Sequence, residues 1–184
     1  MSRVPPLDLD QMTREQRRLH DEIGGTRSGT ARGPFAVWLR TPAIAAKANE
    51  FGNALRLEGT LDKKSFEIAV LVVARHWSAD YEWFAHEKNA LKAGLPTSII
   101  GAIRERRVPT FESEEQTLVY EIVSELVGTT RLSDASYRRA LAFFGLDRMI
   151  ELVSVAGFYS AVAMMINAFE VPVPGDAKPF GDAG

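Results

Sequence analysis

Signals that start helices recur along almost the whole chain, and no segment shows the alternating apolar pattern of a β-strand. Thr41 followed by Pro42 is typical of a helix N-terminus, because threonine caps the first turn and proline needs no backbone N–H there. Similar starts occur near Thr13, Asp62, Thr97, Ser113, Ser133 and Asp147. These helix-start signals predict an all-α bundle of seven or eight helices.

Apolar spacing distinguishes two of the predicted helices. After Pro42, the residues Ile44, Ala48, Phe51 and Leu55 form an apolar stripe along one side. The segment after Asp62 reads FEIAVLVVA and is apolar almost all round. We therefore expect the second of these helices to lie at the centre of the fold.

The stretch 152–169 has 18 residues without a charge, which reaches the lower limit for a membrane-spanning helix. It also contains Ser154, Gly157, Ser160 and Asn167, and no basic cluster marks either end. We expect a buried helix, in the core or at a subunit interface, and no membrane partner.

Length and composition indicate an ordinary globular protein. The 184 residues suit one domain, 1–184, with a core of about 33–170 and an extended tail, 171–184, rich in proline and glycine. A net charge of -2 gives no reason to expect a nucleic-acid partner. The N-terminus lacks the apolar stretch of a signal peptide, which predicts a cytoplasmic location. The sequence contains no cysteine, which excludes disulfides and thiolate chemistry.

Residues that could take part in catalysis lie between positions 66 and 94. Glu67 is an acid in an apolar stretch, and a buried carboxylate requires a partner or a proton. Ala79, Glu82 and His86 share one helix face, and Glu82 can reach His86. On one continuous helix Glu67 and Glu82 would lie about 22 Å apart. They can share a site only if the chain bends between them, and we expect the bend at residues 76–78, with Ser78 capping the next helix.

This window resembles the carboxymuconolactone decarboxylases and the related alkylhydroperoxidase D-like proteins. Their pattern is a glutamate, a Cys-x-x-Cys twelve residues later, and a histidine four residues beyond the second cysteine. Glu67 and His86 match the glutamate and the histidine, whereas Ala79 and Glu82 occupy the cysteine positions. The similarity extends from about Gly33 to Phe169 and includes GPFAVWLRTP and AHEKNALKAGL. The resemblance implies an alkylhydroperoxidase D-like helical bundle, but without cysteines the family's peroxidase chemistry is excluded.

The resemblance further implies acid–base chemistry of the decarboxylase or lactone type, on a small carboxylated compound and without a cofactor. His86 is then the proton donor to the carbanion that remains after loss of CO2. Glu82 orients His86 and balances its charge, and Glu67 serves as a relay. Arg40 or Arg75 would bind a substrate carboxylate. The aromatic side chains Tyr81, Trp38 and Trp77 would line the pocket.

Simpler interpretations exist for each of these residues. His86 can be a helix-surface residue paired with Glu82. Glu67 can be a structural anchor, hydrogen-bonded to a helix terminus or paired with Arg75. Tyr81, Trp77 and Trp83 can belong to the core or to an interface. Glu82 and His86 also have the spacing of two metal ligands, although only His76 or Glu67 could supply a third, and we expect no metal.

Two features outside the window carry less weight. His20 lies on a polar helix, and we expect it to be a solvated surface residue. The loop GGTRSGTARG has the composition of a phosphate-binding loop but lacks its spacing, so we expect no phosphate site there.

The sequence also allows an alternative function and predicts that the chain forms an oligomer. A protein that kept the scaffold and lost its cysteines can be a non-enzymatic binding or assembly protein. The apolar stretches 68–74 and 147–169 exceed what one small domain easily covers, which favours an oligomer. The resemblance implies a symmetric homo-oligomer, a trimer or a hexamer.

Overall fold

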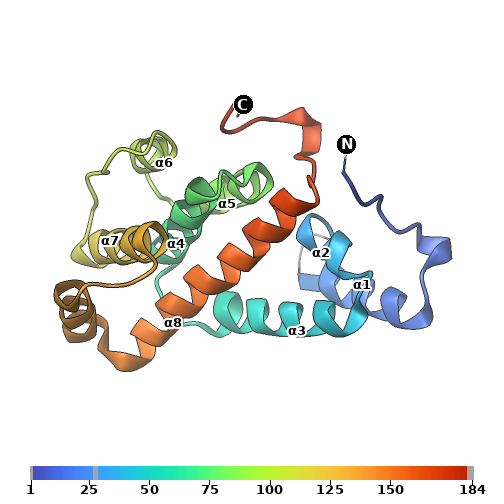
Figure 1. The fold of residues 1–184 in the computed structure, drawn as a ribbon, viewed down its shortest axis with the longest axis horizontal. Coiled ribbons are helices and arrows are strands. Elements are labelled where there is room, and N and C mark those ends of the chain that lie inside the picture. Colours follow the sequence, from blue (N-terminus) through green and yellow to red (C-terminus); the bar gives the residue numbers. More distant parts are fainter. Residues whose placement is uncertain (1, 27–28, 182–184) are drawn as a thin grey trace. The chain divides into compact units, whose positions relative to one another are not determined.

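The structure, a computed structural model, describes residues 2–26 and 29–181. Within these ranges the chain forms eight α-helices and no β-strand, which confirms the predicted all-α fold (Figure 1). The chain divides into two compact units, Met1–Glu58 with Met165–Pro172, and Gly59–Met164 with Val173–Gly184. The prediction of one domain over 1–184 concerns how these units fold together and stays a prediction.

The first unit contains three α-helices, a short 3-10 helix, a short π-helix and the end of α8 from Met165. Thr13 and Gln16 form the predicted cap of its first helix, since each side chain accepts a hydrogen bond from the backbone N–H of the other, over 3.2 and 2.9 Å. The loop GGTRSGTARG includes residues 27 and 28, which lie outside the described residues. The elements are η1 (Leu9–Gln11), α1 (Arg14–Thr26), α2 (Pro34–Trp38), α3 (Pro42–Asn53) and η2 (Ala54–Glu58).

The apolar stripe predicted for α3 is only partly buried. Leu55, which follows α3 in η2, is buried, whereas Ile44 and Phe51 are 54% and 46% exposed. The buried residues of α3 itself are Ala45, Asn49 and Gly52. The helix thus turns small residues toward α1 and α2, which both pack against it.

The second unit is built around α4, as the apolar pattern predicted. Ten consecutive residues of α4, Ser65 to Ala74, are buried, because α5, α6 and α7 all pack against this helix. Asp62 caps α4 by accepting hydrogen bonds from the backbone N–H groups of Lys64 and Ser65. The elements of this unit are α4 (Lys63–His76), α5 (Asp80–Lys92), α6 (Thr97–Arg104), α7 (Glu114–Thr129), η3 (Pro174–Asp176) and α8 (Asp134–Ala168), which belongs to it as far as Met164.

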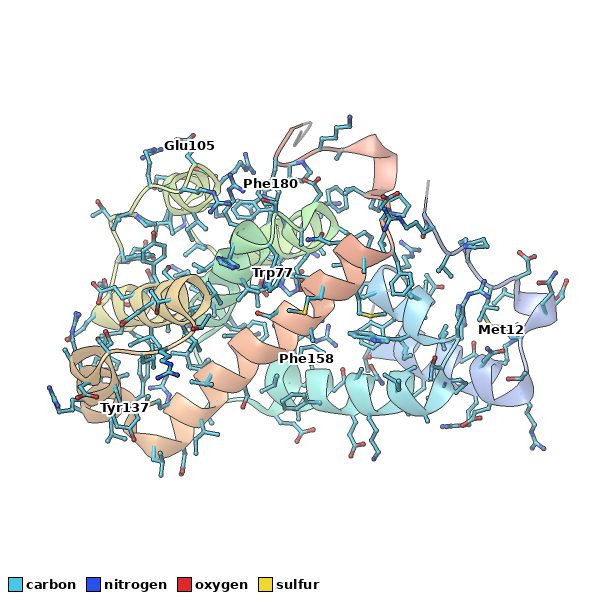
Figure 2. All side chains as sticks on the ribbon, viewed as in Figure 1. Met12, Trp77, Glu105, Tyr137, Phe158 and Phe180 are labelled. Atoms are coloured by element: carbon cyan, nitrogen blue, oxygen red, sulfur yellow. The ribbon has the colours of Figure 1, made fainter. Side chains whose placement is uncertain are left out.

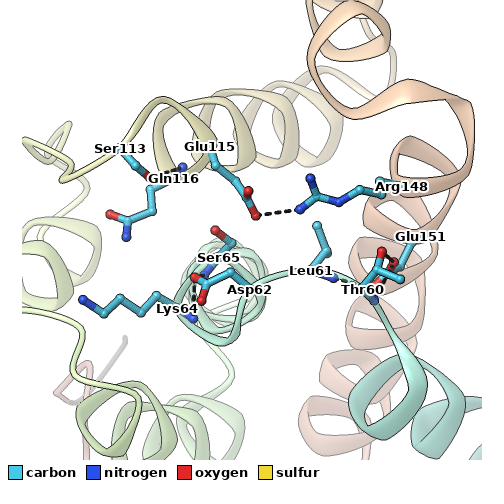
Figure 3. Close-up of polar contacts among 10 residues, drawn as sticks. All are labelled: Thr60, Leu61, Asp62, Lys64, Ser65, Ser113, Glu115, Gln116, Arg148 and Glu151. Carbon is cyan, nitrogen blue, oxygen red and sulfur yellow. Dashed lines mark hydrogen bonds and ion pairs between the residues drawn. The ribbon is translucent and has the colours of Figure 1, made fainter.

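Polar contacts tie α8 to its neighbours in the second unit (Figure 3). Glu151 accepts hydrogen bonds from the backbone N–H groups of Thr60 and Leu61 and from the Thr60 hydroxyl, over 2.6 to 3.1 Å. Burial alone would raise the pKa of Glu151, but these hydrogen bonds outweigh it and lower the pKa. Arg148 pairs with Glu115 of α7 at 2.8 Å. These contacts fix α8 beside the start of α4.

α8 is two helical segments joined at Gly145, where φ is 72° and ψ is 173°. This break confirms the predicted boundary, since residues with a Cβ rarely adopt such a conformation. By length and composition α8 could cross a membrane, with a mean hydropathy of 1.8 over its most apolar window. Half of that window is buried inside the structure, and core helices of soluble proteins pass the same test.

The described part of the tail packs against α5. The backbone N–H of Phe180 donates to the Asp80 carboxylate over 3.0 Å. The ring of Phe180, which is labelled in Figure 2, meets the ring of Trp83 edge-on, with 5.2 Å between centroids. Trp83 is fully buried and is therefore a core residue, as the simpler interpretation of the aromatic residues predicted.

Candidate functional site

The chain bends between α4 and α5, which is the condition for Glu67 and His86 to share a site. α4 ends at His76, and Ser78 has a left-handed backbone conformation with φ of 48°. The backbone N–H of Ala79 then closes the turn on the Ala74 carbonyl over 2.9 Å. Ser78 does not cap α5 as predicted, because the N-cap position is Ala79. The predicted location of the bend is confirmed.

Glu67 of α4 and His86 of α5 meet across this bend. His86 Nδ1 lies 2.7 Å from Glu67 Oε2, and the side chains are only 12% and 10% exposed. An ionised carboxylate can only accept, so Nδ1 carries the hydrogen of this bond. The contact holds the imidazole in one orientation and leaves Nε2 as the nitrogen able to exchange a proton with a ligand.

Glu82 lies on α5 and is 2% exposed. Burial raises the pKa of Glu82 well above its usual range, and the charge of Glu67 raises it further. Glu82 Oε2 is buried and has no hydrogen-bond partner among the described residues. Glu67, not Glu82, orients His86, because His86 Nδ1 is hydrogen-bonded to Glu67 Oε2.

Tyr159 of α8 completes the surroundings of His86, and sequence reasoning missed it. The two rings pack edge-on with centroids 4.9 Å apart. Phe66 and Phe158 pack edge-on against the Tyr159 ring at 5.7 and 5.4 Å, so the imidazole borders an aromatic wall. A phenol within the uncharged stretch 152–169 is the signal that could have found it, since buried tyrosine hydroxyl groups need partners.

The guanidinium of Arg75 makes its hydrogen bonds at the C-terminal end of α4. Its Nε donates to the Arg104 carbonyl over 2.6 Å, and Nη1 donates to Ser78 Oγ over 3.1 Å. The ring of Phe180 covers the guanidinium at 4.6 Å. Burial and the nearby charge of Arg106 lower the pKa of Arg75. These contacts support the bend and the tail, so a role in binding substrate stays a prediction.

The predicted aromatic lining is spread over both units. Tyr81 is half-buried on α5, and Trp77 follows α4 with its ring edge-on to His76 at 5.6 Å. Trp38 belongs to the first unit, where it is buried against Phe35 with ring centroids 5.1 Å apart. The place of these three rings in a pocket stays a prediction.

Arg40, the other candidate for binding a carboxylate, also belongs to the first unit. Its Nη2 donates to the Pro5 carbonyl over 2.7 Å, a contact within that unit. Its role at the site stays a prediction. No group of three histidine, aspartate or glutamate side chains among the described residues is placed to hold a metal ion.

The prediction for His20 is wrong. Only 14% of its side chain is exposed, and each ring nitrogen has a partner. Nδ1 lies 3.0 Å from Asp21 Oδ1, and Nε2 lies 2.9 Å from Thr30 Oγ1. Thr30 lies ten residues beyond His20 in the sequence, and a helical pattern cannot indicate its contact with the imidazole.

Compared with known protein families, with curated proteins and with solved structures, the chain matches none of them. The resemblance to the carboxymuconolactone decarboxylases consequently rests on the spacing of residues in the sequence.

Proposed function

We propose that the protein is a cofactor-independent acid–base enzyme, of the decarboxylase or lactone type, that acts on a small carboxylated organic compound. The observation that carries this proposal is the 2.7 Å contact between Glu67 and His86, with Glu82, a buried carboxyl group whose pKa is raised, on the same helix as His86. Carboxyl groups in different environments together with an imidazole are typical of sites for proton-transfer catalysis.

His86 acts as the proton carrier in this mechanism. Loss of CO2 from the substrate carboxylate leaves the bonding electrons on carbon as an enolate. The protonated His86 donates from Nε2 to that carbon, and the imidazole becomes neutral. Glu67 stabilises the imidazolium before the transfer and keeps Nε2 directed at the substrate.

Glu82 supplies a hydrogen-bond donor. Its protonated carboxyl group has an oxygen without a partner among the described residues, so it can bind the enolate oxygen as negative charge develops. The roles differ from those expected from the sequence, where Glu82 was the orienting residue and Glu67 the relay. The two glutamates exchange roles because Glu67, rather than Glu82, contacts the imidazole of His86.

The test compares wild type with His86→Gln on a panel of β-keto acids and unsaturated lactone carboxylates. Product formation is followed by NMR in deuterated water, because protonation by the enzyme places deuterium on carbon. We expect His86→Gln to lower kcat by about 10² to 10⁴. His76→Gln is the control, since His76 is exposed and outside the Glu67–His86 pair. Full activity of His86→Gln would refute the mechanism.

The alternative is a non-enzymatic binding or assembly protein, and one observation favours it. Glu67 and His86 are only 10% and 12% exposed, which leaves little surface for a substrate. In that case the cluster serves stability alone. The panel above then shows no turnover by wild type, while His86→Gln unfolds at a lower denaturant concentration.

We also propose that the protein forms a symmetric homo-oligomer. The support comes from exposed apolar side chains of α8 in the second unit. Leu146 and Ile150 are each 56% exposed, and Val153 and Met164 are 39% and 50% exposed. They recur along one side of the helix with Gly157 and Ala161, at intervals of three or four residues. Such apolar faces usually meet a partner.

A further inference from the structure

A cavity of about 350 Å³ lies within the first unit, lined by the N-terminal segment, by α1 and by residues from 29 to 39. Leu7, Leu9 and Met12, which is labelled in Figure 2, supply part of its apolar lining. Its polar lining includes His20 and Thr30. Cavities near this volume, with apolar walls and few polar groups, are typical of sites for small organic ligands.

A chain of hydrogen bonds determines which polar groups of this cavity can donate and which can accept. The Asp21 carboxylate can only accept, so the hydrogen on His20 lies at Nδ1, 3.0 Å from Asp21 Oδ1. In a neutral imidazole Nε2 is then an acceptor. The group 2.9 Å from Nε2 is Thr30 Oγ1, so the threonine hydroxyl must donate to it.

Thr30 has therefore used its only hydroxyl hydrogen. Its oxygen keeps lone pairs, and among the described residues Thr30 Oγ1 makes no hydrogen bond except the one with His20. A ligand at this end of the cavity must donate a hydrogen bond rather than accept one. The nearby Asp21 carboxylate disfavours a negatively charged ligand.

We propose that this cavity binds a small neutral molecule with an apolar body and one hydroxyl group, which donates its hydrogen to Thr30 Oγ1. The apolar body lies against Leu7, Leu9 and Met12. This site is independent of the proposed enzyme function, because it lies within the first unit and uses none of the residues Glu67, Glu82 and His86.

The experiment compares two probes that differ in the hydrogen-bond donor. 4-Ethylphenol carries a hydroxyl group, whereas 4-ethylanisole has the same ring and only an acceptor oxygen. Both are titrated by NMR into the full-length protein at pH 8.5, where the imidazole of free histidine is neutral. We expect saturable shifts of the Met12 and Thr30 methyl signals and a phenol affinity about three to ten times higher, which corresponds to one neutral hydrogen bond.

Thr30→Val keeps the shape of the side chain and removes the acceptor. We expect this variant to bind both probes equally, with the affinity that wild type has for the ether. Thr110→Val, at an exposed threonine of the second unit, should keep the wild-type preference. The proposal is overturned if neither probe saturates, if wild type binds the ether as tightly as the phenol, or if Thr30→Val retains the preference. The comparison of the two probe affinities in wild type tests the proposal even if Thr30→Val fails to fold.

Discussion

Among the single residues, Glu82 is the one whose chemical state depends most on its surroundings. On the surface of a protein it would be ionised at neutral pH. At 2% exposure, burial raises the pKa of Glu82 well above its usual range, and the charge of Glu67 raises it further. Glu67 is instead hydrogen-bonded to His86 Nδ1 over 2.7 Å. Two glutamates fifteen residues apart thus have different surroundings, and their possible roles differ accordingly.

Glu82→Gln tests this assignment through stability. Because the folded state raises the pKa of Glu82, the native protein binds a proton that the unfolded chain releases above about pH 4.5. Wild-type stability therefore falls as pH rises from that value toward the folded-state pKa. The glutamine variant lacks this loss, and we expect it to be more stable than wild type at pH 7 by at least about 1 kcal/mol.

Urea unfolding at pH 5, 6, 7 and 8 measures the effect. The difference between Glu82→Gln and wild type should be small at pH 5 and should grow toward neutral pH. Glu58→Gln, at an exposed glutamate of the first unit, is the control and should show no such trend. A constant difference across the range would mean that Glu82 is ionised in the folded protein.

Among the helices, the breaks decide which side chains can meet. The turn at Ser78 returns α5 alongside α4 and brings His86 to Glu67. The break at Gly145 separates the first part of α8 from the long segment that carries Glu151 and Tyr159. At each break one residue, Ser78 or Gly145, has a positive φ. This backbone conformation costs free energy for a residue with a Cβ.

Gly145→Ala and Gly157→Ala form a matched pair on α8. A Cβ would meet no atom within 4 Å at either position, so crowding does not distinguish them. Gly145 has a φ of 72°, whereas Gly157 is helical. We expect Gly145→Ala to destabilise by about 1 to 3 kcal/mol through backbone strain. Gly157→Ala should stabilise by about 0.5 to 1 kcal/mol, because alanine loses less backbone entropy in a helix. Thermal unfolding of both variants measures this, and equal effects would contradict the break.

For the whole molecule, the open question is what covers the exposed apolar side chains. Within the second unit, the apolar residues of α4 are covered by its neighbours, whereas α8 keeps a row of exposed apolar side chains. The sequence alone does not distinguish the two stretches, since both are apolar. Of these two stretches, the one on α8 is the candidate surface for a second copy of the chain.

Light scattering after size-exclusion chromatography tests the assembly. We expect a mass that is three or six times the 20.3 kDa of one chain. Ile150→Glu, at the exposed face of α8, should shift the protein toward the monomer while its helical circular dichroism is retained. Val108→Glu, at a residue 78% exposed outside that face, is the control. A monomeric wild type at all concentrations would exclude the proposal.

Much of the fold could be predicted because helix caps are local. Asp62, Thr13 and Gly145 act through backbone groups a few residues away, so their roles can be read from the neighbouring sequence. The short helix α2, Pro34–Trp38, was not predicted, since five residues are too few to show a period. The stripe of α3 was misjudged because small residues, rather than Ile44 and Phe51, face its neighbours.

By itself the sequence determined the all-α class, the positions of the breaks and the absence of thiol chemistry, because each depends on residue type and near neighbours. Only the tertiary structure decided which carboxylate contacts His86, that Tyr159 borders it, and that His20 lines a cavity. These contacts join residues from different helices or loops. Their distances depend on how the helices pack, and a pattern along one helix carries no information about the residue that arrives from another.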